Sequence, residues 1–169
     1  MARVFISGSS DGLGLMAGKL LVEQGHRVAL HARNATRAAD AKRALPEAEA
    51  VVVGDLETIA SGKDVARQVN ALGPFDAVIH NAAVGYQETR RVTGDGVPHV
   101  FAINTLAPFI LTALIQRPKR LVYMSSGMHE RADANLDDIF WRKRSWNGSS
   151  AYAESKLYDV MLAFAVARL

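Results

Sequence analysis

The chain has 169 residues, of which 49% are hydrophobic and 22% are charged, and it carries a formal net charge of +3. This length suits one domain with a sizeable core, which we assign to residues 1–169. The small positive charge does not by itself indicate nucleic-acid binding, although it would favour an anionic ligand. The absence of cysteine excludes disulfides and cysteine-ligated zinc.

No apolar run reaches the ~20 residues that are needed to cross a bilayer. The first predicted strand begins almost at Met1, which leaves no room for a signal peptide. We therefore expect a cytoplasmic protein without a membrane span.

Short apolar or β-branched runs alternate with helical stretches along the chain. The runs that predict strands are Arg3–Ser7, Arg27–Ala32, Ala50–Gly54, Ala77–His80 and Arg120–Ser125. The stretches that predict helices are Leu13–Gln24, Thr36–Ala44, Ile59–Ala71, roughly Val97–Ile115 and a last one from Ala151 onward. This alternation is typical of βαβ units around a parallel sheet. We predict an α/β fold with a Rossmann-like, doubly wound parallel sheet in three layers, α/β/α.

The C-terminal part of the chain is irregular. Residues 127–150 show no clear period and predict a loop with at most a short helix. The last helix is strongly apolar and stops at Leu169 without a glycine or other stop signal. A parallel sheet that ends at Arg120–Ser125 would leave an open edge. We therefore expect a truncated chain.

The first predicted strand runs directly into a glycine-rich turn and then a helix. Gly8, Gly12 and Gly14 have the spacing GxxxGxG, with Ser10 and Leu13 between them. Glycines at such a turn let a pyrophosphate approach the backbone N–H groups, and the helix N-terminus adds its positive end. The alternative is a tight turn whose glycines are only structural. The strand–turn–helix context favours dinucleotide binding.

The end of the second predicted strand bears on the choice between NAD and NADP. Ala32 and Arg33 stand there, 19 residues or so after Gly14, and neither is an acid that would bond the ribose 2′-OH of NAD. An arginine suits the 2′-phosphate of NADP, so NADP(H) is favoured over NAD(H). Asp11 beside the glycine turn argues mildly against NADP, and Arg33 as a solvated charge is the alternative.

Tyr152 and Lys156 form a possible acid/base pair. A spacing of four residues places both side chains on one face of a helix. A tyrosine titrates near pH ~10, and an adjacent ammonium favours the tyrosinate and lowers that pKa. The same spacing also occurs on solvated helices without any chemistry, so the pair depends on the motifs upstream.

Taken in order, these motifs resemble the short-chain dehydrogenase/reductase family over the whole chain. Gly8, Gly12 and Gly14 match its cofactor turn, and Asp55-Leu56 after the third strand matches its adenine contact. The further matching positions are Asn81-Ala82-Ala83, where the family usually has Asn-Ala-Gly, then Asn104, Ser126, Tyr152 and Lys156. The long insert between Ser126 and Tyr152 looks most like the retinol-dehydrogenase-like and WW-domain-oxidoreductase-like branch.

The resemblance implies carbonyl/alcohol oxidoreduction, with a role for each matching residue. Tyr152 would be the general acid in reduction and the base in oxidation. Lys156 would lower the Tyr152 pKa and hold the nicotinamide ribose. Ser126 would donate a hydrogen bond to the substrate oxygen, and Asn104 would hold a water that links Lys156 to solvent.

Three of these residues could instead have purely structural roles. Ser125 and Ser126 could both be ordinary strand-end serines, Asn104 could satisfy a buried polar position, and Asp55 could cap the next helix. Family members also continue through a Pro-Gly loop, a substrate-covering segment and further strands that this sequence does not contain. A nucleotide-binding module without turnover, either a sensor or a truncated fragment of such an enzyme, is therefore the rival hypothesis.

The expected partners are a small-molecule carbonyl or alcohol substrate and further copies of the chain. The family resemblance implies a homodimer or homotetramer formed through the helices that contain Asn104 and Tyr152. The basic and aromatic run Phe140–Trp146 could be a nucleic-acid patch, but a surface segment or substrate-side flap is favoured. The five histidines show no ligand spacing, so we predict no metal site.

Overall fold

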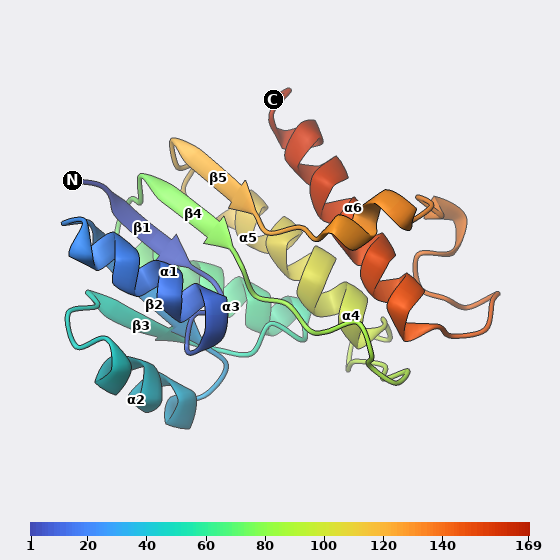
Figure 1. The fold of residues 1–169 in the computed structure, drawn as a ribbon, viewed down its shortest axis with the longest axis horizontal. Helices are drawn as coiled ribbons and strands as arrows, with labels where there is room; N and C mark the ends of the chain where they lie inside the picture. Colours follow the sequence, from blue (N-terminus) through green and yellow to red (C-terminus); the bar gives the residue numbers. More distant parts are fainter.

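A computed structural model describes all residues from Met1 to Leu169. Five parallel strands form one sheet in the order β3-β2-β1-β4-β5 (Figure 1). The strands are β1 Arg3–Ile6, β2 Arg27–Ala32, β3 Ala50–Val53, β4 Ala77–His80 and β5 Arg120–Tyr123. The chain builds outward from β1 to β3, crosses back to place β4 on the other side of β1, and then adds β5. The strand order reverses between β1 and β4, which is where doubly wound sheets bind their ligands.

Helices cover both faces of the sheet, as the sequence predicts. They are α1 Gly12–Glu23, α2 Ala35–Ala44, α3 Ile59–Ala71, α4 His99–Phe101, α5 Ala107–Leu114 and α6 Gly148–Val166. On one face, α1 and α2 pack against a cluster of seven buried residues that includes Ile6 and Leu30. On the other face, α3 and α5 pack against a cluster of 13 buried residues that includes Phe5 and Val78. The sheet is therefore the middle of three layers.

Burial on both faces explains why the strands are apolar throughout. In β2, five of the six residues are buried. A parallel sheet covered by helices on both sides selects such continuous apolar runs. None of the helices combines the length and the apolar character that a membrane crossing requires.

The predicted helix over residues 97–115 is interrupted. It consists of α4, a π-helical turn over Ala102–Leu106 and α5. The π turn contains Asn104, and such turns occur frequently at functional sites because they shift the backbone out of the regular hydrogen-bond pattern. A 3.6-residue apolar period cannot distinguish this arrangement from a continuous α-helix.

The segment between β5 and α6 contains two short 3-10 helices, Gly127–Arg131 and Leu136–Asp138, within otherwise irregular chain. We call the first of these η2. The final helix begins earlier than the sequence predicts, at Gly148 instead of Ala151. The reason is a cap, since the side chain of Asn147 accepts a hydrogen bond from the backbone N–H of Ser150.

Candidate active site

An open cleft of about 730 Å³ lies at the carboxyl ends of the strands. The loops after β1, β2, β3 and β4 all contribute to its wall. Its lining includes every predicted cofactor residue upstream of the π turn: Gly8, Ser10, Gly12, Leu13, Gly14, Arg33, Asp55, Leu56, Asn81 and Ala82. The fold therefore gathers these dispersed motifs in one place.

The glycine turn is held tightly against the loop after β4. Gly8 has a φ of +60°, and a Cβ atom at this position would lie 2.5 Å from the Cα of Ala82. The Asn81 Nδ2 group donates to the backbone oxygens of Gly8 at 2.7 Å and Ser7 at 3.1 Å. Asn81 thus fixes the turn, and this is a structural task for a residue predicted only as a cofactor contact.

His31 supports the same turn from β2, and the sequence did not single it out for this. Its Nδ1 accepts a hydrogen bond from the backbone N–H of Gly8 at 2.9 Å, and its Nε2 lies 2.8 Å from the carbonyl oxygen of Gly54. Burial lowers the pKa of His31, so the neutral ring with a proton on Nε2 fits both contacts.

The N-terminus of α1 faces the cleft without a side-chain cap. Asp11 is its N-cap residue, but the carboxylate makes no capping hydrogen bond. The N-cap side chains of α2, α3 and α6 all make such a bond. The first N–H groups of α1 have no partner within the helix and are suited to an anion.

Two arginines line the cleft beyond β2. Arg33 follows the strand, and Asn34 caps α2 by accepting from the backbone N–H of Arg37. The Arg37 side chain lines the cleft, where it forms an ion pair with Asp11. Asp11, the acid that argues against NADP, is therefore paired with Arg37. The sequence alone did not indicate Arg37 as a cleft residue.

Asp55 does not cap α3, so that alternative is wrong. Its carboxylate accepts from the backbone N–H of Glu57 at 2.9 Å. Thr58 and Ser61 instead form a reciprocal capping box at the start of α3. Asp55 and Leu56 line the cleft, as an adenine contact requires.

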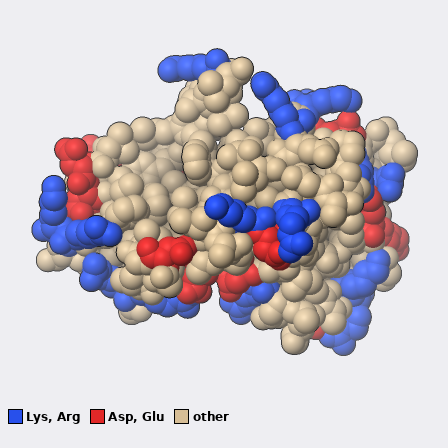
Figure 2. Space-filling view, turned by 180° about the vertical axis from the view of Figure 1, so that it is seen from behind, with Lys and Arg blue, Asp and Glu red and all other residues tan.

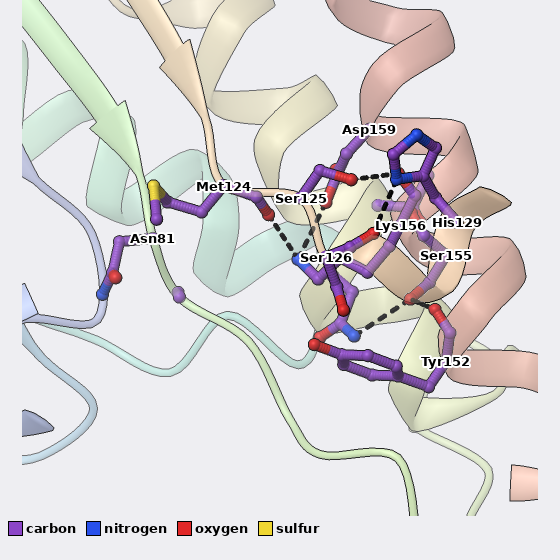
Figure 3. A network of polar contacts seen from close by, with 12 residues as sticks. Asn81, Met124, Ser125, Ser126, His129, Tyr152, Ser155, Lys156 and Asp159 are labelled. Carbon is purple, nitrogen blue, oxygen red and sulfur yellow. Dashed lines mark hydrogen bonds and ion pairs between the residues drawn. The ribbon is translucent and has the colours of Figure 1, made fainter. Parts of the chain in front are cut away.

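The Tyr152–Lys156 pair lies on α6 (Figure 3). Lys156 is almost completely buried. Its Nζ donates to the carbonyl oxygen of Met124 at 2.8 Å and to Oδ2 of Asp159 at 2.9 Å. An ammonium has three N–H donors, so one remains without a partner in the protein. The Tyr152 ring meets the ring of Tyr86 edge-on, with their centroids 6.2 Å apart.

The two serines after β5 have different partners. The Ser125 hydroxyl donates to the backbone oxygen of Lys156 at 3.0 Å. The Ser126 oxygen accepts from the backbone N–H of Met128 at 3.3 Å, which leaves its own O–H without an acceptor. Ser126 is therefore the better placed of the two to donate to a substrate.

Asn104 links the cleft wall to α6. Its Oδ1 accepts from the backbone N–H of Val84 at 2.8 Å, and its Nδ2 donates to the Ser155 hydroxyl at 3.0 Å. Val84 lines the cleft, and Ser155 donates in turn to the backbone oxygen of Tyr152. Asn104 does satisfy a buried polar position, and in doing so it joins the helix of Tyr152 to the wall of the cleft.

Comparison with known proteins agrees with this geometry. A family model described as short chain dehydrogenase matches residues 2–128. The chain belongs to the short-chain dehydrogenase family. An oxidoreductase of Emericella nidulans is 54% identical over 171 residues, which covers 99% of this chain and 64% of that protein. Human retinol dehydrogenase 14 is 32% identical over 190 residues, which covers 98% of this chain and 56% of that protein.

The fold is shared with a solved structure as well. A crystal structure of a protein from Mycobacterium paratuberculosis superposes with a TM-score of 0.86 at 28% identity, covering 99% of this chain and 62% of that one. The similarity to retinol dehydrogenase 14 confirms the predicted resemblance to that branch. This short-chain dehydrogenase chain spans 56–64% of the length of these relatives.

The long insert of this short-chain dehydrogenase folds back on α6. Arg144 pairs through two nitrogens with Glu154, both at 2.6 Å, and its guanidinium lies 3.7 Å from the ring centre of the buried Trp141. Trp141 meets Trp146 edge-on. Arg144, Trp141 and Trp146 in the run Phe140–Trp146 thus make contacts within the protein. On the face drawn in Figure 2, Lys and Arg side chains lie among Asp and Glu side chains.

His80, at the end of β4, makes the stability of the protein sensitive to acid. Its ring is buried, Nδ1 has no hydrogen-bond partner, and burial lowers the pKa of His80 to about 4. The unfolded chain takes up a proton near pH ~6.5. The stability that His80 contributes is therefore present above pH ~6.5 and is lost as the pH falls toward 4.

We expect His80→Phe, which keeps a ring beside Tyr123, to reduce this acid sensitivity. Between pH 7 and pH 5 the variant should lose about 2 kcal/mol less unfolding free energy than the wild type. Urea denaturation at both pH values measures the difference. Asp159 changes stability in the opposite direction in this range, but it is present in both proteins and cancels. Equal losses in the two proteins would show that His80 is not buried in its neutral form.

Proposed function

We propose that this short-chain dehydrogenase binds NADP(H) in the cleft and interconverts a carbonyl and an alcohol, with Tyr152 as general acid/base. The observation that carries the proposal is the hydrogen-bonded connection from Val84 through Asn104 and Ser155 to Tyr152. It ties the acid/base helix to the wall of a cleft that has the features of a dinucleotide site.

The residues present fit the cofactor at three points. The uncapped N-terminus of α1 and the glycine turn suit a pyrophosphate. Arg33 and Arg37 suit a 2′-phosphate, because a guanidinium can bond a phosphate with two parallel N–H groups. The remaining N–H of Lys156 suits a ribose hydroxyl.

The chain's own residues would donate the proton and bind the substrate oxygen, while bound NADPH would supply the hydride. In reduction, the Tyr152 hydroxyl donates its proton to the oxygen on which negative charge develops. The free O–H of Ser126 donates a hydrogen bond to the same oxygen. The positive charge of Lys156 stabilises the tyrosinate that remains. Alcohol oxidation runs the same steps in reverse.

Cofactor choice tests the assignment of the basic end of the cleft. Arg33→Ala should weaken NADPH binding by about 10- to 100-fold, the cost of a charge-assisted hydrogen bond, and leave NADH binding nearly unchanged. Titration of cofactor fluorescence measures both affinities. Arg43→Ala is the matched control, because Arg43 lies on α2 but pairs with Asp40 outside the cleft. Equal losses for NADPH and NADH in Arg33→Ala would contradict the 2′-phosphate assignment.

We also propose self-association through the helices that carry Asn104 and Tyr152. Phe109 and Leu114 on α5 and Met161 and Phe164 on α6 are exposed apolar side chains, which supports a contact there. Sedimentation of the protein across a concentration series tests it, and a monomer at every concentration would contradict it.

A further inference from the structure

Tyr86 is an exposed aromatic residue that lies beside the proposed acid/base group. It belongs to the loop after β4, and 50% of its surface is exposed. Its ring meets the Tyr152 ring edge-on, with the ring planes at 65° and the centroids 6.2 Å apart. Because the two rings are in contact, a molecule whose oxygen bonds to the Tyr152 hydroxyl has its substituents within reach of the Tyr86 ring.

The backbone at and after Tyr86 is fixed to α6 and to the residues just before that helix. The Ser149 hydroxyl donates to the carbonyl oxygen of Tyr86 at 3.4 Å, and Nε1 of Trp146 donates to the carbonyl oxygen of Glu88 at 3.0 Å. Gly148 makes this close approach possible, because a Cβ atom at its position would lie 2.6 Å from the Glu88 oxygen. The loop is thus docked on the helix of the acid/base group.

The same loop is also fixed on the side of the cleft. Val84 exchanges two hydrogen bonds with the Asn104 side chain, at 2.8 and 3.2 Å. The Glu88 carboxylate lies 2.7 Å from Nδ1 of the buried His99 on α4. Tyr86 lies between these two attachments, and a tyrosine side chain has only two χ angles, so little conformational entropy is lost when its ring is ordered against a ligand. A fixed and exposed ring of this kind is suited to ligand contact.

We propose that Tyr86 is a specificity-determining residue that contacts the substrate and favours carbonyl compounds and alcohols with an aromatic ring next to the reacting carbon. This inference rests on the proposed function, which places the substrate oxygen at Tyr152 and Ser126. A substrate ring bound there can stack on the Tyr86 ring or meet it edge-on, and aromatic pairs of this kind are stronger than burial of their area alone. A short alkyl chain makes no such contact.

The binding of two alcohols in the presence of NADPH tests the proposal without turnover, because an alcohol and a reduced cofactor cannot exchange a hydride. Benzyl alcohol is the aromatic probe, and propan-1-ol is the probe without a ring. Tyr86→Ala should weaken binding of benzyl alcohol by about 5- to 10-fold and binding of propan-1-ol by no more than about 2-fold. Tyr86→Phe keeps the ring and should bind both alcohols like the wild type. NMR titration of the protein with each alcohol measures the affinities.

Leu20→Ala is the matched control for non-specific binding of the aromatic probe. Leu20 lies on α1 outside the cleft lining and is exposed to a similar extent, 54%, so its removal should leave both affinities unchanged. Equal losses for the two alcohols in Tyr86→Ala, a loss in Tyr86→Phe as large as in Tyr86→Ala, or a wild type that binds no benzyl alcohol would overturn the proposal. Failure of the proposed function would appear separately, as Tyr86-dependent binding of benzyl alcohol without any reduction of benzaldehyde by NADPH.

Discussion

Replacing Tyr152 with phenylalanine is expected to lower turnover by about 10²- to 10⁴-fold, the usual contribution of a positioned general acid. The ring and its edge-on contact with Tyr86 would stay, while the hydroxyl that we propose as the proton donor to the substrate oxygen would be lost. Because the proposed nucleotide contacts lie in the glycine turn, at the arginines and at Lys156, the affinity for NADPH should be nearly unchanged. Steady-state rates of NADPH oxidation, together with a fluorescence titration of binding, give both quantities.

Tyr158→Phe is the matched control for this substitution. Tyr158 lies on the same helix, and its hydroxyl donates to the backbone oxygen of Asn135. Tyr158→Phe therefore removes the same hydroxyl group from a position where we propose no role in the reaction. Turnover in this control should remain close to the wild-type rate. If Tyr152→Phe oxidised NADPH as fast as Tyr158→Phe, Tyr152 would not be the acid.

Gly8→Ala is expected to destabilise the fold by about 3 kcal/mol or more, from backbone strain and a steric clash together. The residue has a φ of +60°, and the new Cβ would lie 2.5 Å from backbone of Ala82, which cannot move as a flexible side chain could. The displacement would also pull the turn away from Asn81 and His31. Urea denaturation should therefore show a lower midpoint, and NADPH binding should weaken in the same variant.

Gly12→Ala separates the clash from the strain. Gly12 also has a positive φ, +52°, but no atom lies within 4 Å of its Cβ position. Only the backbone strain of about 1–2 kcal/mol should appear. Equal destabilisation by the two substitutions would mean that the turn does not rest on the loop after β4.

The sequence predicts the sheet and most of the cleft for one physical reason. In a parallel sheet, the carboxyl ends of all strands lie at the same edge, so motifs that follow separate strands must meet there. Gly8, Arg33, Asp55 and Asn81 were each placed after a strand, and all of them line the cleft. The order of strands and helices, which apolar periodicity provides, places these positions at one edge, whereas the roles of Asp55 and Asn81 were implied by the family resemblance.

The contacts that support these residues could not be predicted in the same way. The His31 ring contacts the backbone of Gly8, 23 residues away in the sequence, and Arg37 on α2 forms an ion pair with Asp11 beside the glycine turn. Asp159 lies in a predicted helix that is mostly apolar. Its spacing of three residues from Lys156 could have predicted the ion pair between them. Such partnerships depend on side-chain rotamers and on packing between distant segments.

Element boundaries depend on similarly local interactions. The π turn around Asn104 changes the backbone hydrogen bonds without changing the apolar pattern. The early start of α6 depends on one side-chain bond from Asn147. Both features place site residues, and both are decided by a few hydrogen bonds that compete with the regular helix.

A crystal structure of the protein with NADP+ bound measures the central claim most directly. We predict the pyrophosphate at the N-terminus of α1, the 2′-phosphate within hydrogen-bonding distance of Arg33 or Arg37, and a nicotinamide ribose hydroxyl bonded to Lys156 with Tyr152 beside the nicotinamide. A dinucleotide bound elsewhere, or one whose nicotinamide end lies away from Tyr152 and Lys156, would contradict the account.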